Sequence, residues 1–144
     1  MADSQVGTPA SLADRADEAA NRAIVQNIYD SASRGDLQPM WDALSHGDFT
    51  AYEYDSLPWG GVHRGYDANV ALTRKVAEYF DYSTIRMHHY CVDREVVIAY
   101  GSLMWRGING TEPREVPVAE CWEVRDGQPR SIRPFFWDTA SYAT

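Results

Sequence analysis

The first half of the chain has the hydrophobic spacing of α-helices. From about Leu12 to Ser33, apolar residues recur three and four positions apart, which predicts a helix. Its expected inner face consists of Ala16, Ala20, Ala23, Ile24, Ile28 and Ala32. Gly35 is placed to end this helix, and Asp36 to cap a short second helix that includes Trp41 on its apolar face. A third helix is expected over 67–80.

The second half alternates apolar and polar residues with the period of β-strands. A short strand is predicted over 49–53, before a glycine-rich loop over 57–65. Four longer strands follow, and they are predicted over 83–92, 96–105, 115–125 and 130–137. Turns are expected at 93–95 and 109–111. Helices followed by a run of strands predict an α+β protein, in which a curved antiparallel sheet wraps around the helices.

The last two predicted strands form a hairpin with two carboxylates on an otherwise apolar face. If its loop is 125–127, Val124 faces Gln128 and the even-numbered residues share one side. That side carries Val116, Val118, Glu120, Trp122, Val124, Ile132, Pro134, Phe136 and Asp138. A buried carboxylate is costly unless it is paired or protonated, so Glu120 and Asp138 are candidate functional groups. Pro134 cannot donate a ladder hydrogen bond, which predicts a bulge or bend there.

Composition limits the classes of partner and the number of domains. The 144 residues are expected to form a single domain over 12–144, after a disordered tail over 1–11. The net charge of -8 makes nucleic acid and anionic membranes poor partners. No apolar run approaches the roughly 20 residues that cross a bilayer, and no signal peptide is evident, which favours the cytoplasm. Cys91 and Cys121 are expected to be buried or half-buried free thiols.

Four stretches carry a resemblance to a known superfamily. They are the helix end NIYDSASRGDL, the loop LPWGGVHRG, the run VAECWEVRDG and the ending IRPFFWD. With them the chain resembles the nuclear-transport-factor-2-like (NTF2-like) superfamily, and within it the SnoaL-like polyketide cyclases and their ketosteroid-isomerase relatives. The resemblance implies a cone-shaped mixed sheet around three N-terminal helices, a cystatin-like or ketosteroid-isomerase-like α+β barrel. It also implies an elongated pocket between sheet and helices, open at one end.

The resemblance implies roles for four residues. Glu53 falls on the position of the base carboxylate of ketosteroid isomerase, and Glu120 falls on the carboxylic acid of its oxyanion hole. Tyr29 lies one position from the first-helix tyrosine of that enzyme. Asp138 lies near the catalytic aspartate of SnoaL-like cyclases.

Each of these carboxylates also has a plainer interpretation. Glu53 continues the alternation of Phe49 and Ala51, so burial would raise its pKa and suit it to a general base; a solvated strand end is the alternative. Glu120 could stay protonated and stabilise an enolate, or could pair internally with Arg133, Arg106 or a histidine. Asp138 could equally cap the final turn.

His88 and His89 are adjacent in a predicted strand, so only one of them can face inward. Parity with Ile85, Met87 and Cys91 favours His89, either as a proton shuttle or as a core histidine bonded to a backbone carbonyl. His88 is kept as a candidate substrate contact. The histidines show neither H-x-H nor HExxH spacing, so no metal and no other cofactor is expected.

Aromatic residues are candidates for the pocket wall and for an interface. Trp59 is expected either to close over an apolar ligand as a lid or to pack against the third helix. Tyr29, Tyr54 and Tyr66 could donate hydrogen bonds into the pocket, with packing as the alternative for each. The expected walls are Trp41, Trp122 and Phe136. Phe135 and Trp137 fall on the outer face of the last strand, where a large apolar patch, together with the resemblance, predicts a sheet-to-sheet homodimer.

Three functional hypotheses follow. The first is a cofactor-independent cyclase of natural-product biosynthesis, which closes a ring in an apolar, carbonyl-bearing, polyketide-like substrate by aldol addition or cycloaddition. The second is a ketosteroid-isomerase-like isomerase or dehydratase with Glu53 as base and Glu120 as acid. The third is a non-catalytic module that binds a small ligand.

Overall fold

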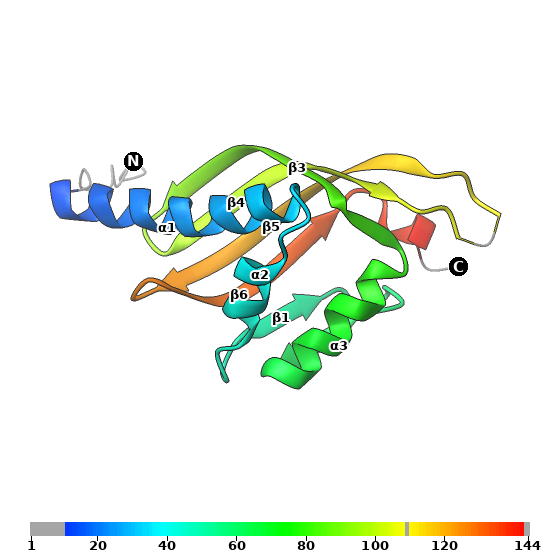
Figure 1. Ribbon diagram of the computed structural model, residues 1–144, viewed down its shortest axis with the longest axis horizontal. Helices are drawn as coiled ribbons and strands as arrows, with labels where there is room; N and C mark the ends of the chain where they lie inside the picture. The colour runs from blue at the N-terminus through cyan, green and yellow to red at the C-terminus, as the bar shows by residue number, and fades with distance from the viewer. Residues whose placement is uncertain (1–10, 109, 143–144) are drawn as a thin grey trace, which may run out of the picture.

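The structure is a computed structural model that describes residues 11–108 and 110–142 (Figure 1). Over these residues the helices are α1 (Leu12–Ala32), α2 (Gln38–Leu44), α3 (Tyr66–Ala77) and the 3-10 turn η1 (Thr139–Tyr142). The strands are β1 (Thr50–Glu53), β2 (Gly61–Arg64), β3 (Phe80–Asp93), β4 (Val96–Trp105), β5 (Arg114–Arg125) and β6 (Gln128–Phe136). Ser11 caps α1 through a capping box with Asp14, so it does not belong to a tail. Residues 1–10 of the expected tail lie outside the described residues.

Within the described residues, the strands form one six-stranded mixed sheet in the order β2-β1-β6-β5-β4-β3. The β1–β6 pair is parallel, and the other neighbouring pairs are antiparallel. Figure 1 shows the sheet curving, with α1, α2 and α3 on its concave side. The prediction of an α+β fold with a curved sheet wrapped around N-terminal helices is confirmed.

The loop before α3 and the end of α3 differ most from the sequence prediction. The glycine-rich loop contains the edge strand β2, which pairs with β1 so that Glu53 lies opposite Gly61. The third helix ends at Ala77 and not at Phe80, because Phe80 is fully buried and begins β3 opposite Trp105. The earlier start of β3 adds residues 80–82 to the sheet.

The β5–β6 hairpin keeps the predicted parity through two compensating differences. Its loop is Asp126-Gly127, with Arg125 opposite Gln128, and not the expected three-residue loop. The pairing then shifts between Val124↔Pro129 and Glu123↔Ser131, which leaves one extra residue on β6. The shorter loop pairs even-numbered residues of β5 with odd-numbered residues of β6, as in Val124↔Pro129. The bulge restores the expected pairing of even with even, as in Trp122↔Ile132. The bulge expected at Pro134 therefore lies nearer the loop, and Glu120 still faces the concave side.

Helix α1 buries only part of its expected face, namely Ile28 and Ala32, with Ile24 packed partly buried against the core. Its buried residues are Asn21, Val25, Ile28, Tyr29, Ser31 and Ala32. Ala16, Ala20 and Ala23 are exposed, so this part of the prediction is wrong. Figure 1 shows the reason, since the N-terminal half of α1 extends past the edge of the sheet and has little to pack against.

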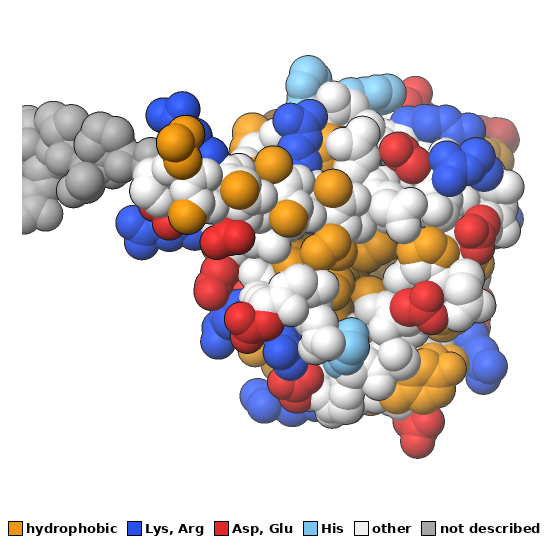
Figure 2. All heavy atoms as spheres, turned by 60° about the vertical axis from the view of Figure 1, so that its left-hand side comes forward, with side chains coloured by type: hydrophobic (Ala, Val, Ile, Leu, Met, Phe, Trp, Pro, Cys, Tyr) orange, Lys and Arg blue, Asp and Glu red, His pale blue; other side chains and the backbone are white. Residues whose placement is uncertain are grey.

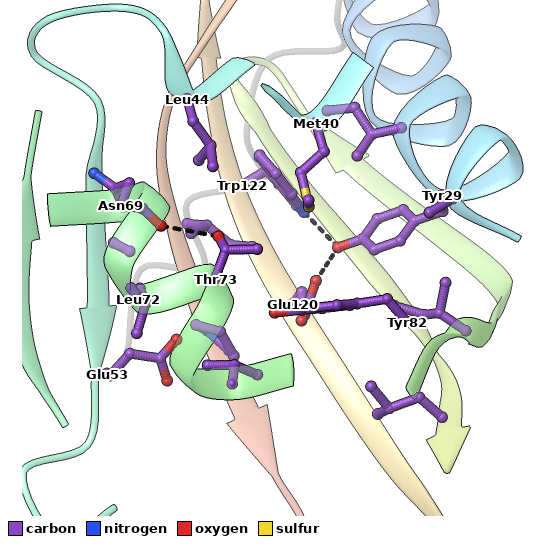
Figure 3. A pocket seen from close by; sticks show the side chains of 18 of the residues that line it. Tyr29, Met40, Leu44, Glu53, Asn69, Leu72, Thr73, Tyr82, Glu120 and Trp122 are labelled. Atoms are coloured by element: carbon purple, nitrogen blue, oxygen red, sulfur yellow. Dashed lines mark hydrogen bonds between the residues drawn. The ribbon is translucent and has the colours of Figure 1, made fainter. Parts of the chain in front are cut away.

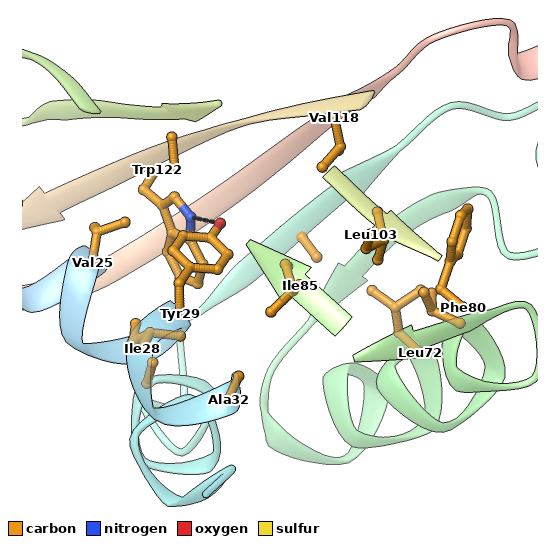
Figure 4. Packing of buried hydrophobic residues seen from close by; sticks show 14 of the residues in the cluster. Val25, Ile28, Tyr29, Ala32, Leu72, Phe80, Ile85, Leu103, Val118 and Trp122 are labelled. Atoms are coloured by element: carbon orange, nitrogen blue, oxygen red, sulfur yellow. Dashed lines mark hydrogen bonds between the residues drawn. The ribbon is translucent and has the colours of Figure 1, made fainter. Parts of the chain in front are cut away.

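The hydrophobic core is one cluster on the concave side of the sheet, and Figure 4 shows two groups of its side chains. Val25, Ile28 and Tyr29 of α1 lie against Trp122 of β5, and the Tyr29 and Trp122 rings meet edge to face with centroids 6.1 Å apart. The second group includes Leu72 of α3 and Phe80 of β3, which lie on the far side of Ile85 in Figure 4. The pocket described below lies between these groups.

Candidate active site

A cavity of about 90 Å³ lies between the concave face of the sheet and the three α-helices. Side chains from α1, α2, α3 and from β1, β3, β4, β5 and β6 form its walls, and most of them are apolar. Its polar lining residues are Tyr29, Glu53, Asn69, Thr73, Tyr82 and Glu120. Figure 2 shows hydrophobic side chains on the floor of a hollow beneath α1, and Figure 3 shows the pocket from close by. The pocket expected between sheet and helices is therefore present.

Glu120 lies in the middle of β5, between Val118 and Trp122 on the same face. Its Oε2 accepts a hydrogen bond from the Tyr29 hydroxyl. Burial raises the pKa of Glu120 to about 7, and the hydrogen bond from Tyr29 acts in the opposite direction because it favours the charged form. The partner of Glu120 is thus a tyrosine of α1, and not the arginine or histidine considered from the sequence.

Tyr29 connects Glu120 to a third side chain. Its hydroxyl accepts a hydrogen bond from Nε1 of Trp122 over 2.6 Å and donates its own proton to Glu120. Burial and the nearby charge of Glu120 raise the pKa of Tyr29 well above its ordinary value, so the phenol stays protonated. Tyr29, Glu120 and Trp122 form a hydrogen-bonded row in which only the carboxyl group exchanges a proton near neutral pH.

Glu53 ends β1 and reaches the same cavity from the other side of the pocket (Figure 3). Its Oε2 accepts a hydrogen bond from Nε1 of Trp59 over 3.2 Å. Burial and the charge of Glu120 raise the pKa of Glu53 to about 8, against a smaller opposing effect of the Trp59 hydrogen bond. The alternative of a solvated strand end is wrong.

The two carboxyl groups influence each other. The charge of Glu120 is the second cause of the raised pKa of Glu53, after burial. No arginine or lysine side chain is among the residues that line the cavity in the described part of the chain. Because two unpaired negative charges are unfavourable in such surroundings, the pair holds at least one proton at neutral pH. The Tyr29 hydrogen bond favours the charged form of Glu120, and the charge of Glu120 favours the protonated form of Glu53.

Asp138 lies outside the cavity, which corrects the expectation that it faces inward. The strand β6 ends at Phe136, and Asp138 follows in a left-handed conformation with φ of 55°. It is exposed, and its carbonyl accepts hydrogen bonds from the backbone N–H and hydroxyl of Ser141. The alternation therefore stops before Asp138, and the residue closes the final turn.

Neither His88 nor His89 faces the cavity, because the register of β3 shifts between them and the preceding residues. Met87 pairs with Gly101, while His89 pairs with Tyr100, so His88 is an extra residue in the strand. The shift places both histidines in solvent, and His89 stacks on Tyr100 with ring centroids 6.2 Å apart. The same shift leaves Cys91 exposed, contrary to expectation.

The aromatic candidates divide between wall, core and surface. Trp122 and Phe136 line the cavity as expected. Trp59 is only 3% exposed and packs among Tyr79, Phe80, Phe136 and Tyr142, so it is a core residue and not a lid. Trp41 is half-buried against the core but is not a cavity wall, and Tyr54 and Tyr66 are exposed.

The sequence reasoning missed three polar residues of the pocket. Tyr82 lies before the expected start of its strand, and Asn69 and Thr73 lie one helical turn apart on α3. Asn69 is 1% exposed, and its Nδ2 donates to the carbonyls of Phe49, His63 and Gly65, which joins α3 to β1 and β2. Asn69, Leu72, Thr73 and Val76 are spaced to lie on one helical face. This spacing is the signal that could have identified Asn69 and Thr73 as pocket residues.

Two further findings concern sites of other kinds. Among residues 11–108 and 110–142, no group of three or more His, Cys, Asp or Glu side chains is arranged to hold a metal ion. Within the same residues, no helix has the length and apolar character needed to cross a membrane.

Comparisons with known proteins identify the fold. No family model matches the sequence, and no curated protein matches it. Among solved structures, an NTF2-like protein of unknown function from Burkholderia pseudomallei has a TM-score of 0.71 at 20% identity, over 85% of this chain and 93% of that one. A proposed SnoaL-like polyketide cyclase from Jannaschia has a TM-score of 0.71 at 16% identity, over 96% and 99%. TerC, crystallised with polyporic acid, has a TM-score of 0.68 at 15% identity, over 85% and 95%. The chain has the NTF2-like fold, and at these identities the likeness concerns the fold alone.

Proposed function

We propose that this protein is a cofactor-independent acid–base enzyme of the polyketide-cyclase type, which forms an enolate from an apolar carbonyl substrate and closes a ring by aldol addition. The observation that supports the proposal is the presence of Glu53 and Glu120, both with raised pKa values, in one apolar cavity. Groups that exchange protons near neutral pH are suited to act on carbon acids. Structural similarity to a proposed SnoaL-like polyketide cyclase agrees with this chemistry.

The hydrogen bonds of the two carboxyl groups suggest which one is the base. Glu120 is stabilised as a carboxylate by the Tyr29 hydroxyl, so it removes a proton from the carbon next to the substrate carbonyl. Glu53 keeps its proton and donates a hydrogen bond to the carbonyl oxygen, where negative charge develops. This assignment is the reverse of the one that the resemblance to ketosteroid isomerase implied.

Ring closure completes the sequence of proton transfers. The enolate carbon attacks a second carbonyl of the same substrate, so one carbon–carbon bond forms, the first carbonyl is restored and the second carbonyl becomes an alkoxide. The proton that Glu120 removed then passes to this alkoxide, which returns both carboxyl groups to their starting states. Atoms and charges balance without a cofactor.

The size of the cavity sets a requirement for substrate entry. Ligand pockets are typically about 300–1,000 Å³, which is larger than the 90 Å³ cavity of this structure. A ring system can therefore bind only if wall side chains move. Met40 on α2 is half-buried at the wall, and a flexible thioether is suited to such movement.

An isomerase is the second candidate, and the small cavity favours it. Moving a double bond next to a carbonyl uses the same proton removal by Glu120 and the same donor, Glu53, but needs no room for a folding chain. Cycloaddition is less well supported, because it needs a pocket of the right shape but no acid or base. The two buried carboxyl groups cost stability and would have no role in that reaction.

Solvent deuterium exchange tests the shared first step of both candidates. Apolar ketones and polyketones are incubated in D2O with the wild-type protein, and deuterium next to the carbonyl is measured by mass spectrometry. We expect enzyme-dependent exchange that is lost in Glu120→Gln and strongly reduced in Glu53→Gln. Glu123→Gln is the matched control, because Glu123 lies on β5 and contacts Arg125 and Ser131 away from the cavity. Binding without exchange would instead support a ligand-binding module.

A further inference from the structure

Strand β3 contains an irregular segment whose two end residues both face the cavity. Its pairing with β4 moves from Asp81↔Met104 directly to Arg86↔Ser102, so residues 82–85 lie opposite Leu103 alone. Tyr82 and Ile85, the two ends of this segment, both line the cavity. Tyr82 has the same parity as buried Phe80, and the shift lets Ile85, of the opposite parity, face inward as well, so both side chains reach one cavity.

Side chains of the segment itself hold it in place. Oδ1 of Asp81 accepts hydrogen bonds from the backbone N–H of Ser83 over 3.0 Å and from its hydroxyl over 2.7 Å. The Thr84 hydroxyl donates to the carbonyl of Asp81 and accepts from the backbone N–H of Met104 over 2.9 Å. The last bond replaces a missing ladder bond between the strands. The position of Tyr82 is therefore built into the fold.

The Tyr82 hydroxyl is the unused donor of the pocket. Among the described residues it makes no hydrogen bond, whereas the Tyr29 hydroxyl is bonded to Glu120 and Trp122. In Figure 3 the Tyr82 ring extends from β3 beside Glu120 toward the middle of the pocket. Burial, followed by the charges of Glu120 and Glu53, raises the pKa of Tyr82 far above its ordinary value. The phenol is thus a permanently protonated donor within the influence of both carboxyl groups.

We propose that Tyr82 is a catalytic residue that donates a hydrogen bond to the carbonyl oxygen of the substrate and, with protonated Glu53, forms the oxyanion hole for the enolate. This inference rests on the proposed function and adds the position of the substrate oxygen to it. The carbonyl oxygen lies between the Tyr82 hydroxyl and Glu53, and the carbon that loses its proton faces Glu120. Two neutral donors stabilise the negative charge on the carbonyl oxygen more than one does, because each adds a hydrogen bond to it. Neither donor has to be reoriented during the reaction, since the fold already holds both in place.

The test combines one variant, one matched control and one binding probe. Tyr82→Phe removes only the hydroxyl, which makes no hydrogen bond to residues 11–108 or 110–142, so the fold is expected to remain intact by circular dichroism. Tyr52→Phe is the control, because Tyr52 lies on β1 under the Arg133 guanidinium and does not line the cavity. We expect Tyr82→Phe to lower the exchange rate about 100-fold to 1,000-fold, as loss of one oxyanion donor does in other enzymes. Tyr52→Phe should keep the wild-type rate.

The binding probe is 4-nitrophenol, whose yellow ionised form resembles an enolate. Tyr82→Phe is expected to bind the ionised form at least about 10-fold more weakly than the wild type or Tyr52→Phe, following the usual value of a charge-assisted hydrogen bond. Wild-type exchange rate and wild-type affinity in Tyr82→Phe would overturn the inference, and so would failure of the wild type to bind the probe. If the wild type exchanges no ketone but binds the probe through Tyr82, the proposed function fails and the donor assignment stands.

Discussion

The hydroxyl of Tyr29 donates a hydrogen bond to the carboxylate of Glu120, and the N–H of Trp122 fills the other side of that hydroxyl. Because Trp122 is a donor only, the Tyr29 proton has to point toward Glu120. The row of side chains therefore favours the ionised form of Glu120. Glu53 receives a similar hydrogen bond from Trp59 but also experiences the charge of Glu120. This difference separates the two carboxyl groups into a base and an acid.

Replacement of Tyr29 should move the pH dependence of the reaction. Tyr29→Phe removes the hydrogen bond that lowers the pKa of Glu120, so that pKa should rise by on the order of one unit. Since the base has to be ionised, the rising limb of the pH–rate profile is expected to move to higher pH by the same amount. The profile of the deuterium exchange rate measures this. An unchanged rising limb would show that Glu120 is not the base.

Replacement of Trp59 should move the falling limb of the pH–rate profile. Trp59→Phe keeps an aromatic ring in the core but removes the donor to Glu53, which raises the pKa of Glu53 further. The falling limb, where the acid loses its proton, is then expected to move to higher pH while the rising limb stays in place. Trp137→Phe is the control, because Trp137 is 75% exposed and lies away from the cavity. If the wild type, Trp59→Phe and Trp137→Phe have the same pH–rate profile, the role of Glu53 as acid is contradicted.

The stability of the protein should decrease as the pH rises through the neutral range. Both carboxyl groups have pKa values above the ordinary 4.5, at about 8 for Glu53 and about 7 for Glu120, so the folded state binds more protons than the unfolded state in this window. Their contribution to stability is complete below about pH 4.5 and is lost as the pH rises to about 8. Each group contributes a slope of at most about 1.4 kcal/mol per pH unit.

Urea unfolding of the wild type and of Glu53→Gln at several pH values between about 5 and 9 measures this contribution. The wild type is expected to lose free energy of unfolding relative to the variant as the pH rises. The comparison with the variant cancels the titration of the histidines and other groups that both proteins share. A stability difference between the wild type and Glu53→Gln that stays constant over this window would mean that Glu53 titrates at or below its ordinary pKa.

The outer face of the sheet carries an apolar patch, and we propose that it forms a homodimer interface. Phe135 is 44% exposed beside Tyr54, with ring centroids 6.1 Å apart, and Trp137 is more exposed still. Exposed Val96, Ile98 and Tyr100 on β4 extend the apolar surface of the sheet. Changing both Phe135 and Trp137 to Ser should convert a dimer into a monomer in sedimentation velocity experiments. Leu12→Ser on α1 is the control, and a monomeric wild type at micromolar concentration would rule out the dimer.

Residues on uninterrupted elements were placed correctly from the sequence. Glu120 and Trp122 face the cavity because β5 pairs with β4 without a shift from Arg114 to Glu123, so the two-residue period is retained. Val96–Trp105 was predicted with the bounds that β4 has in the structure. In such strands the pattern alone decides which face a residue occupies, because one face is buried and the other is not.

Residues next to irregularities could not be placed in this way. The extra residue at His88 reverses the parity of β3 and puts His89 in solvent, and the left-handed backbone at Asp138 ends the alternation of β6. Tyr82 has the same parity as buried Phe80 and was missed because β3 begins at Phe80, three residues before the expected start of the strand. Trp59 became a core residue because its loop folds back against Phe80 and Tyr142.

Direct titration of the two carboxyl groups is the measurement that tests the central claim most directly. In carboxyl carbon NMR spectra of protein labelled at glutamate, one signal should titrate near pH 8 and be missing from Glu53→Gln, and another should titrate near pH 7 and be missing from Glu120→Gln. The Glu53 signal should also move to lower pH in Glu120→Gln, since the charge of Glu120 contributes to its pKa. Spectra in which every glutamate titrates near its ordinary pKa of 4.5 would contradict the account.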